Sequence, residues 1–336
     1  MLDEMMEEIP TESRRERRRA ARRGAARRPA SRRRRILIVI ASFLAVLLIG
    51  ILGYAWFLNS KLDNIAREPM LPTATTDADG KKLVTGQGTN YLLIGSDAGP
   101  DRVGARADVI QLVHVPKDHS AVWLIHFPRD LYVEIPGHGE DKVNAAFAFG
   151  GAPLLTETVQ NLVGVKIDHV AKTDFEGFKA LTDALGGVRV NAVEASPGFQ
   201  QGWNDLDGAQ ALAFVRERYA LSEGDISRGQ RQQEWLRAIM DKTLDPAVLL
   251  NPITLANVMD AGGRYTVLDE TLSSEKIRSE ALKMRGIRGG DIHFITAPFA
   301  GFGTSPSGAS IDIFDEAAMD RLGDALQSDD MANYTE

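Results

Sequence analysis

The chain has 336 residues, of which 44% are hydrophobic and 25% are charged, so it is long and apolar enough for one large folded domain or two small ones. It contains no cysteine, which excludes disulfides and thiolate metal sites. Its formal net charge of -7 is unevenly distributed, because residues 1–35 carry +7 and the rest of the chain carries -14. The six histidines never occur at the spacing of a zinc-binding HExxH motif. Composition therefore predicts a basic arm in front of an acidic body.

The arm, residues 1–35, is rich in arginine and has few large apolar side chains, so it is predicted to be disordered. Residues 36–58 follow as 23 residues without a charge, which predicts a transmembrane helix. Aromatic residues at the far end of this run resemble an interfacial belt and favour a retained helix over a cleaved signal peptide. The positive-inside rule places the arm in the cytoplasm and residues 59–336 outside the cell membrane. No nucleic-acid partner is expected for the arm.

Beyond the membrane helix, residues 59–87 are predicted to be a linker, residues 88–327 one domain and residues 328–336 a polar tail. Short runs of β-branched, aliphatic and aromatic residues predict strands at 90–95, 109–115, 121–127, 131–135, 167–173, 188–193 and 292–298. Amphipathic patterns with caps or breaks predict helices at 153–162, 174–186, 207–216, 228–244 and 315–326. This alternation predicts an α/β fold, a three-layer α-β-α sandwich around a mixed central sheet.

The stretch from 209 to 235 is unusual because its charged residues continue an apolar helix face. Arg228 and Gln232 lie within about 60° of Trp235 and Ile239 on a helix, so both are predicted to face inward. Arg231 and Asp225 belong to the same cluster. A buried charge is costly unless it is paired, so the cluster meets either carboxylates of its own chain or an anionic ligand.

Arg216 and Arg218 are two residues apart, a spacing that places them on one face only in extended chain. The helix that begins near Asp207 is therefore predicted to end at or before this pair. An internal salt-bridge network is one interpretation of these arginines. The surplus of arginine over nearby acids favours the other, a clamp for an anionic ligand.

A second group of charged and polar residues lies at turns and strand ends between residues 95 and 145. It comprises Asp97, Arg106, Asp108, Arg129, Lys142 and Asn144. Each alone could be an exposed turn residue. Together, Asp97 and Asp108 could hold a hard cation such as Mg²⁺, while several arginines bind phosphate oxygens bidentately. The chain lacks the P-loop, dinucleotide-binding and GxSxG motifs, so this group predicts phosphoryl transfer without a nucleotide fold.

Several segments, taken in order, resemble the LytR-CpsA-Psr family of bacterial envelope proteins. They are NYLLIGSD, ARADVIQLVHV, HFPRDLYVEIPGHGEDKVNAAFAFGG, LVGVKIDHVAKTDFEGFKALTDALGGVRV and LDGAQALAFVRERYALSEGDISRGQRQQEWL. The resemblance covers about residues 88–245, and the basic arm with a single membrane helix is also similar to this family. Family members attach glycopolymers from polyprenyl-pyrophosphate carriers to peptidoglycan.

The resemblance implies a role for each predicted site residue. Asp97 and Asp108 would hold Mg²⁺ or Mn²⁺, and Arg129, Arg216 and Arg218 would clamp the pyrophosphate. Asp225, Arg228 and Gln232 would form a supporting polar ring, and Lys142 and Asn144 match the family's DK-N motif. The residues predicted to bind substrate are Arg106, Lys142, Asn144, Arg228, Arg231 and Gln232. A lipid pocket is implied between sheet and helices, with Phe175, Phe178, Leu181 and Trp123 as candidate lining.

Two features depart from the family pattern. RADV stands where many members have RSDT or RTDT, so a hydroxyl after Asp108 is missing, and Phe147 and Phe149 replace frequent tyrosines. The function that the resemblance implies is metal-assisted transfer of a glycopolymer to peptidoglycan, with Asp97 or Asp225 as the base. The alternatives are a polyprenyl-pyrophosphate hydrolase, and a non-catalytic envelope regulator or transcription attenuator.

Overall fold

The computed structural model describes residues 32–73, 83–96, 106–222 and 224–335, and the chain divides into two units, Met1–Phe57 and Leu58–Glu336. In the first unit runs most of helix α2 (Arg32–Asp63). Its part from Ser42 to Asp63 contains an 18-residue window with a mean hydropathy of 1.9, and in the described chain it is the one helix long and apolar enough to cross a membrane. This segment largely overlaps the uncharged run predicted to span the bilayer.

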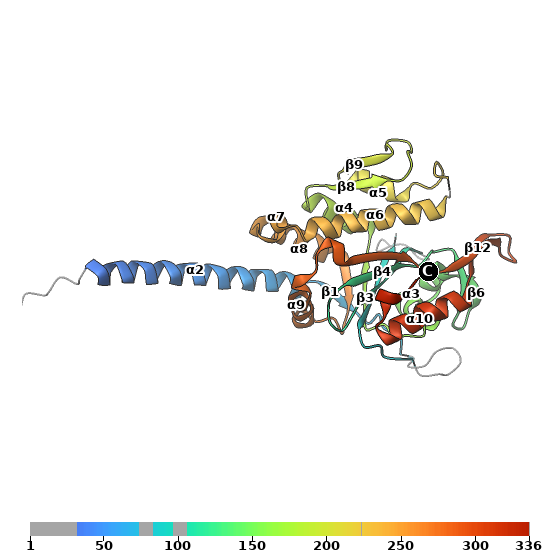
Figure 1. Ribbon diagram of the computed structural model, residues 1–336, viewed down its shortest axis with the longest axis horizontal. Helices are drawn as coiled ribbons and strands as arrows, with labels where there is room; N and C mark the ends of the chain where they lie inside the picture. The colour runs from blue at the N-terminus through green and yellow to red at the C-terminus, as the bar shows by residue number, and fades with distance from the viewer. Residues whose placement is uncertain (1–31, 74–82, 97–105, 223, 336) are drawn as a thin grey trace, which may run out of the picture. The chain divides into compact units, whose positions relative to one another are not determined.

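A mixed seven-stranded sheet forms the centre of the second unit (Figure 1). Its strands, in spatial order, are β1 (Ala66–Glu68), β10 (Thr266–Asp269), β7 (His169–Thr173), β2 (Thr89–Ser96), β3 (Ala107–Val115), β4 (Val122–His126) and β11 (Ile292–Thr296). Strand β2 pairs in parallel with β7 and antiparallel with β3. The predicted mixed sheet is therefore confirmed.

Helices cover both faces of this sheet, so the predicted three-layer sandwich is also confirmed (Figure 1). One face carries α3 (Val143–Val163) and α10 (Glu316–Ser328). The other face carries α4 (Phe175–Ala184), α5 (Gly208–Arg216), α6 (Asp225–Thr243) and α8 (Pro252–Tyr265). The other α-helices described in this unit are the four-residue α7 (Pro246–Leu249) and the ten-residue α9 (Ser274–Lys283).

Two smaller sheets extend the sandwich. The first, in spatial order, consists of β12 (Phe299–Thr304), β13 (Ser310–Phe314), β5 (Leu131–Ile135) and β6 (Gly139–Lys142). The second is a hairpin of β8 (Val188–Ala192) and β9 (Gly202–Leu206). Strands β6, β9, β12 and β13 are not predicted from the sequence, because they are short and contain many polar or glycine residues that hide the alternating pattern.

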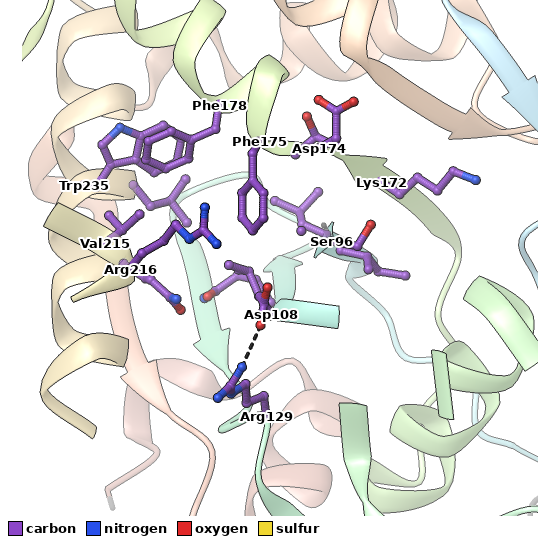
Figure 2. A pocket seen from close by; sticks show the side chains of 18 of the residues that line it. Ser96, Asp108, Arg129, Lys172, Asp174, Phe175, Phe178, Val215, Arg216 and Trp235 are labelled. Carbon is purple, nitrogen blue, oxygen red and sulfur yellow. Dashed lines mark hydrogen bonds and ion pairs between the residues drawn. The ribbon is translucent and has the colours of Figure 1, made fainter. Parts of the chain in front are cut away.

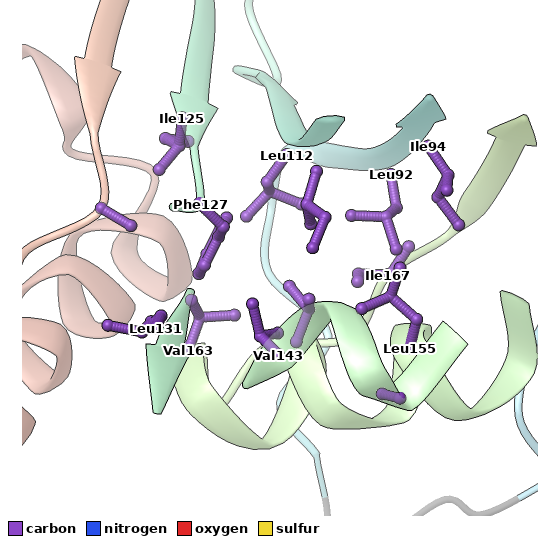
Figure 3. Packing of buried hydrophobic residues seen from close by; sticks show 14 of the residues in the cluster. Leu92, Ile94, Leu112, Ile125, Phe127, Leu131, Val143, Leu155, Val163 and Ile167 are labelled. Carbon is purple, nitrogen blue, oxygen red and sulfur yellow. The ribbon is translucent and has the colours of Figure 1, made fainter. Parts of the chain in front are cut away.

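The main core lies between the central sheet and α3. Figure 3 shows Leu92 and Leu112, which are partners across β2 and β3, facing Val143 and Leu155 of α3. All four side chains are fully buried. Because successive strand residues point to opposite faces, Leu93 of β2 points to the helices of the other layer. One strand thus supplies the core on one side and a second compartment on the other.

Helix boundaries follow the capping signals of the sequence. Asp174 accepts a hydrogen bond from the Gly177 amide at 2.8 Å and begins α4, while Asp207 begins α5 with a capping box. Helix α3 starts ten residues before the predicted Pro153, because it bends at Gly150 and Gly151 instead of starting after them. Gly151 has φ 66° and ψ -157°, a conformation that glycine adopts readily.

Part of the predicted linker belongs to the folded unit. Strand β1 pairs in parallel with β10 at the sheet edge, and Met70 is 2% exposed within the main core. A three-residue strand is too short to leave a pattern in the sequence, which explains why it is not predicted. The folded unit thus begins within a few residues of the end of α2.

We expect Leu155→Ala to lower the free energy of unfolding by about 2–5 kcal/mol, because Leu155 is fully buried and truncation leaves a cavity. Leu282→Ala is the matched control, since Leu282 is 64% exposed on α9 and its truncation should change stability by less than about 0.5 kcal/mol. Denaturant unfolding of the detergent-solubilised chain measures both. Equal losses in the two variants would contradict this placement of the core.

Candidate functional site

A cavity of about 540 Å³ lies between the central sheet and the helical layer formed by α4, α5 and α6 (Figure 2). Its floor comes from β2, β3 and β7 and includes Leu93, Val109 and Ala171. This is the side of β2 that faces away from the main core. Its volume falls in the range of small-molecule and cofactor sites.

One end of the cavity is apolar. Phe175, Phe178 and Leu181 from α4 meet Val215 of α5 and Trp235 of α6. The rings of Phe178 and Trp235 stack with centroids 3.8 Å apart, and the Trp235 indole donates to Thr182 Oγ1 at 3.1 Å. These contacts hold the aromatic wall in place while leaving the cavity open. The cavity wall thus includes three of the four predicted lipid-pocket residues.

The other end of the cavity is cationic. Arg129 Nη1 donates to Asp108 Oδ1 at 2.7 Å (Figure 2), and the guanidinium of Arg216 lies 4.7 Å from the Phe175 ring centroid. Arg218 Nη2 donates to the hydroxyl of Tyr219 at 2.6 Å. Among the described lining residues, basic side chains outnumber acidic ones by five to two. This end therefore suits an anionic group.

The end of α5 places two of these arginines together. The helix stops at Arg216, and Glu217 has the extended backbone angles φ -63° and ψ 132°. Because the helix has ended, Arg218 is not turned to the opposite side from Arg216, and both arginines line the cavity. The predicted end of this helix and the predicted common face of the pair are confirmed.

Helix α6 places Arg228 and Gln232 in the cavity wall beside Trp235. Arg228 is only 7% exposed, as its inward-facing position on the helix predicts. His126, at the end of β4, is also buried. Burial, and to a lesser extent the positive charge of Arg228, lowers the pKa of His126 to about 4. The imidazole is therefore neutral at pH 7 and adds no second charge beside Arg228.

Arg231 lies outside the cavity, although it was predicted to bind substrate. Its guanidinium donates to Ser196 Oγ at 2.9 Å and to the Glu194 carbonyl at 3.0 Å, and it lies 4.4 Å from the Phe214 ring centroid. It is 4% exposed within the core between α6 and the β8–β9 hairpin. Because Arg231 is about 60° around the helix from Arg228, it faces this neighbouring core. Its position supports a structural role.

A second, more polar pocket of about 530 Å³ adjoins the first and shares Arg129, Arg218 and Tyr219 with it. Its other lining residues are Arg106, Asp130, Lys142, Asn144, Gly224 and Ser310. Lys142 Nζ contacts Asp130 Oδ1 at 2.8 Å, and Arg129 Nε lies 3.8 Å from Asp130 Oδ2. The structure thus brings the predicted Arg106, Lys142 and Asn144 beside Arg129 and Arg218.

The structure does not describe the side chains of two acidic residues that were predicted to belong to the site. Asp97 lies outside the described residues, and for Asp225 the structure describes the start of α6 but not the side chain. Within the described chain no group of three or more His, Cys, Asp or Glu side chains could hold a metal ion. Asp108 does line the cavity with its carboxylate partly exposed, and Mg²⁺ commonly takes only one or two protein carboxylates plus phosphate oxygens and water. Asp108 is thus the one described carboxylate of the predicted pair that could hold a cation, and it could do so only together with a phosphorylated ligand.

The structure adds residues that the sequence does not single out. Tyr219 is 87% exposed at the junction of the two pockets, and Asp130 bridges Arg129 and Lys142. Gln111 and His126 are buried cross-strand partners below Arg228. In the sequence, Gln111 could have been noticed only as a polar residue within the apolar run of β3. The structure places the remaining lipid-pocket candidate, Trp123, outside the cavity, stacked on His293 at 4.2 Å.

The structure shows where the residues that depart from the family pattern lie. Val109, where a hydroxyl is frequent, forms part of the cavity wall and packs against Gly95, where an added Cβ would lie 2.9 Å from the Val109 Cβ. Phe149 is half exposed and stacks on His138 at 4.6 Å. Phe147 packs against the main core.

Comparison with known proteins agrees with this geometry. The model of the LytR_cpsA_psr family matches residues 61–328, which is most of the second unit. The chain belongs to the LytR-CpsA-Psr family. The match begins before β1, so it includes the segment of the predicted linker that pairs with the sheet.

Similar proteins within this family act in cell-wall assembly. The chain is 35% identical over 309 residues to the probable cell wall biosynthesis protein LcpB of Corynebacterium glutamicum, covering 86% of this chain and 70% of LcpB. It is 33% identical over 225 residues to the polyisoprenyl-teichoic acid–peptidoglycan teichoic acid transferase TagT of Bacillus subtilis, covering 61% of this chain and 69% of TagT. The structure of TagT bound to LI-WTA matches with a TM-score of 0.59 and 26% identity, over 76% of this chain and 99% of that one.

The pKa of His126 predicts a pH dependence of stability. The pKa is about 4 in the folded chain and about 6.5 in the unfolded chain, so between these values the unfolded state binds more protons. The free energy of unfolding should therefore fall as the pH decreases from 6.5 to 4, by on the order of 3 kcal/mol from this group. His126→Asn should flatten that dependence, whereas His138→Asn, at an exposed position, should leave it unchanged. Thermal unfolding across this pH range measures both, and parallel curves for His126→Asn and wild type would refute the assignment.

Proposed function

We propose that this protein transfers a glycopolymer from a polyprenyl-pyrophosphate carrier to peptidoglycan. The observation that carries the proposal is the cavity itself, which is apolar at the α4 end and cationic at the Arg129 and Arg216 end. A polyprenyl pyrophosphate has the same division, with a hydrocarbon chain attached to a doubly phosphorylated head. The names of LcpB and TagT support a role in this chemistry.

The apolar end would hold the first isoprene units of the carrier. Phe175, Phe178 and Trp235 offer ring faces, and hydrocarbon buried against them leaves water. Close to them, the guanidinium of Arg216 already lies over the Phe175 ring at 4.7 Å. The cavity wall therefore changes from apolar to cationic within one side-chain length, as a ligand with a lipid part and a phosphate part requires.

The cationic end would bind the pyrophosphate. Arg129, Arg216, Arg218 and Arg228 carry donors that match phosphate oxygens, and Arg228 is buried enough for its charge to act in a low dielectric. Gln232 lies in the same wall and can add an uncharged donor. The polar pocket that shares Arg129 and Arg218 would receive the sugar end of the donor and the peptidoglycan acceptor.

In the proposed reaction an acceptor hydroxyl of peptidoglycan attacks the phosphorus that carries the glycan. A new O–P bond forms, and the bond from that phosphorus to the bridging oxygen of the pyrophosphate breaks. The bridging oxygen leaves with polyprenyl phosphate, and a carboxylate takes the hydroxyl proton. Asp97 and Asp225 remain the predicted bases. The arginines stabilise the negative charge that develops on the bridging and non-bridging oxygens.

Mg²⁺ or Mn²⁺ is proposed as the cofactor. Asp108 would hold the ion together with phosphate oxygens, and Asp97 remains the second predicted carboxylate. When bound, the ion would neutralise charge on the pyrophosphate. Arg129 donates to Asp108, so in this proposal it orients the carboxylate as well as contacting phosphate.

A membrane-anchored arrangement accompanies this proposal. Helix α2 would cross the membrane once, with the Arg-rich arm in the cytoplasm and the folded unit outside. The positive-inside rule supports this orientation, since the charge of the first 35 residues is strongly basic. The carrier lipid and peptidoglycan would then both be on the side of the folded unit.

Replacing the clamp arginines tests the proposed chemistry. Arg129→Ala and Arg218→Ala should each lower the transfer rate by roughly 100-fold or more, because each removes donors that stabilise transition-state charge. The full chain in vesicles is assayed with a lipid-linked glycan and peptidoglycan, and the glycan attached to peptidoglycan is measured. Arg321→Ala is the control, since Arg321 is exposed on α10 at the opposite face of the sheet.

The products of the same assay distinguish the alternatives. Polyprenyl phosphate released without glycan joined to peptidoglycan would indicate a hydrolase. No turnover by wild type in the presence of Mg²⁺ or Mn²⁺ would favour a non-catalytic envelope regulator. Full activity of both arginine variants would exclude the clamp.

A cavity-filling substitution tests the lipid end. Ala171→Phe on β7 should reduce the rate of transfer from a long-chain carrier at least roughly tenfold, because the new ring would fill cavity space that the lipid chain is proposed to occupy. Ala317→Phe, at an exposed position of α10, should have no effect. The Michaelis constants for long-chain and short-chain carriers are compared. An unchanged Michaelis constant for the long-chain carrier in Ala171→Phe would show that the lipid binds elsewhere.

A further inference from the structure

A patch of aliphatic side chains is exposed where α7 meets α8. Leu249 is 45% exposed, Leu250 is 82% exposed and Ile253 is 73% exposed. Three large aliphatic residues are thus solvent-accessible within five positions. We name this group the α7–α8 patch. Single exposed apolar residues need no explanation, but a contiguous group marks a surface that contacts another apolar phase.

The α7–α8 patch is built rigidly. Asp245 accepts from the Ala247 amide at 2.7 Å and begins α7, and the Leu250 amide donates to the Pro246 carbonyl at 2.9 Å. Asn251 then accepts from the amides of Ile253 and Thr254 and begins α8. The backbone on both sides of Leu250 is therefore capped and bonded. The outward position of these side chains is fixed by two helix ends.

Helix α8 is attached to the residues that directly follow the membrane-crossing run. Lys61 Nζ contacts Asp260 Oδ1 at 2.7 Å, and at Gly263 an added Cβ would lie 3.1 Å from Ile65. Lys61 is three residues beyond Leu58, where the uncharged run ends. Ile253 is seven residues from Asp260, which is about 10 Å along the helix. In a chain anchored by α2, this short separation would bring the patch near the bilayer surface.

We infer that the α7–α8 patch inserts into the boundary between headgroups and acyl chains of the bilayer that α2 crosses. We favour a lipid surface over a protein partner because the chain that contacts α8 is covalently continuous with the helix proposed to cross the bilayer. Aliphatic side chains on a helix start can enter this boundary without removing backbone groups from their hydrogen bonds. The patch and the end of α2 then form two points of attachment.

This inference rests on the proposed membrane-anchored transfer and adds an orientation to it. Helix α8 packs against α4, which supplies Phe175 and Phe178 to the cavity wall. Thr266, directly after α8, also lines the cavity. Contact of the patch with lipid thus sets the direction in which the apolar end of the cavity faces, and so the route by which a lipid carrier enters.

Single-cysteine labelling tests the contact, since the natural chain has no cysteine. Full-length Leu250→Cys, Ile253→Cys and Phe302→Cys are labelled with bimane and reconstituted in phosphatidylglycerol–phosphatidylcholine vesicles, with and without nitroxide-labelled acyl chains. Phe302 is the control because it is 63% exposed on β12, which Figure 1 shows on the other side of the folded unit from α7. Nitroxide quenching at 250 and 253 should be at least about twofold stronger than at 302.

Equal quenching at the three positions would overturn the inference. So would a blue-shifted label at position 250 that nitroxide lipids do not quench, because that result indicates a protein contact such as a second copy of the chain. These measurements need no enzymatic activity, so they remain valid even if the proposed function is wrong.

An activity measurement addresses the consequence for carrier entry. The double variant Leu250→Ser with Ile253→Ser should slow transfer from a long-chain carrier in vesicles about fivefold or more, since lipid contact by two large side chains is lost. Transfer from a short-chain carrier in detergent should match wild type. Unchanged transfer in vesicles would refute the orienting role, and absence of transfer by wild type in both assays would instead refute the proposed function.

Discussion

Strand β2 divides the domain through the alternation of its side chains. Leu92 is buried in the main core that faces α3 (Figure 3), while Leu93 and Gly95 line the cavity under the opposite helices. A change of register by one residue would exchange the core and the cavity wall. The close packing of the α3 face fixes that register, and the other face can then remain hollow. The cavity depends on this difference between the two faces, because the closely packed α3 face contributes the folding stability that the hollow face does not.

The sequence predicted the parts of the fold that carry strong patterns. Strands β2, β3, β4 and β5 are rich in apolar residues and have turns between them, and α4 and α5 begin at the acidic caps Asp174 and Asp207. The mixed sheet and the two covered faces follow from these elements. Strands such as β1 and β10 have three or four residues and owe their existence to each other and to β7, a tertiary cause that a local pattern cannot contain.

The candidate site was predictable to the extent that helix geometry constrains it. The wheel position of Arg228 and Gln232 and the two-residue spacing of Arg216 and Arg218 place all four correctly in the cavity wall. Arg231 shows the limit of the same reasoning, since a residue at the edge of the stripe faces whichever neighbour lies there, and here that neighbour is the β8–β9 hairpin. The neutral state of His126 beside Arg228 depends on strand pairing and burial, and both arise only in the folded structure.

The pairing of β1 with β10 has a mechanical consequence. Only seven residues separate Leu58 from Ala66, and the latter already belongs to the sheet. In the membrane-anchored arrangement proposed above, this connection would act as a short stalk, because little free chain separates α2 from the sheet. It would limit how far the folded unit can move away from the lipid surface, so the proposed acceptor would have to approach the protein.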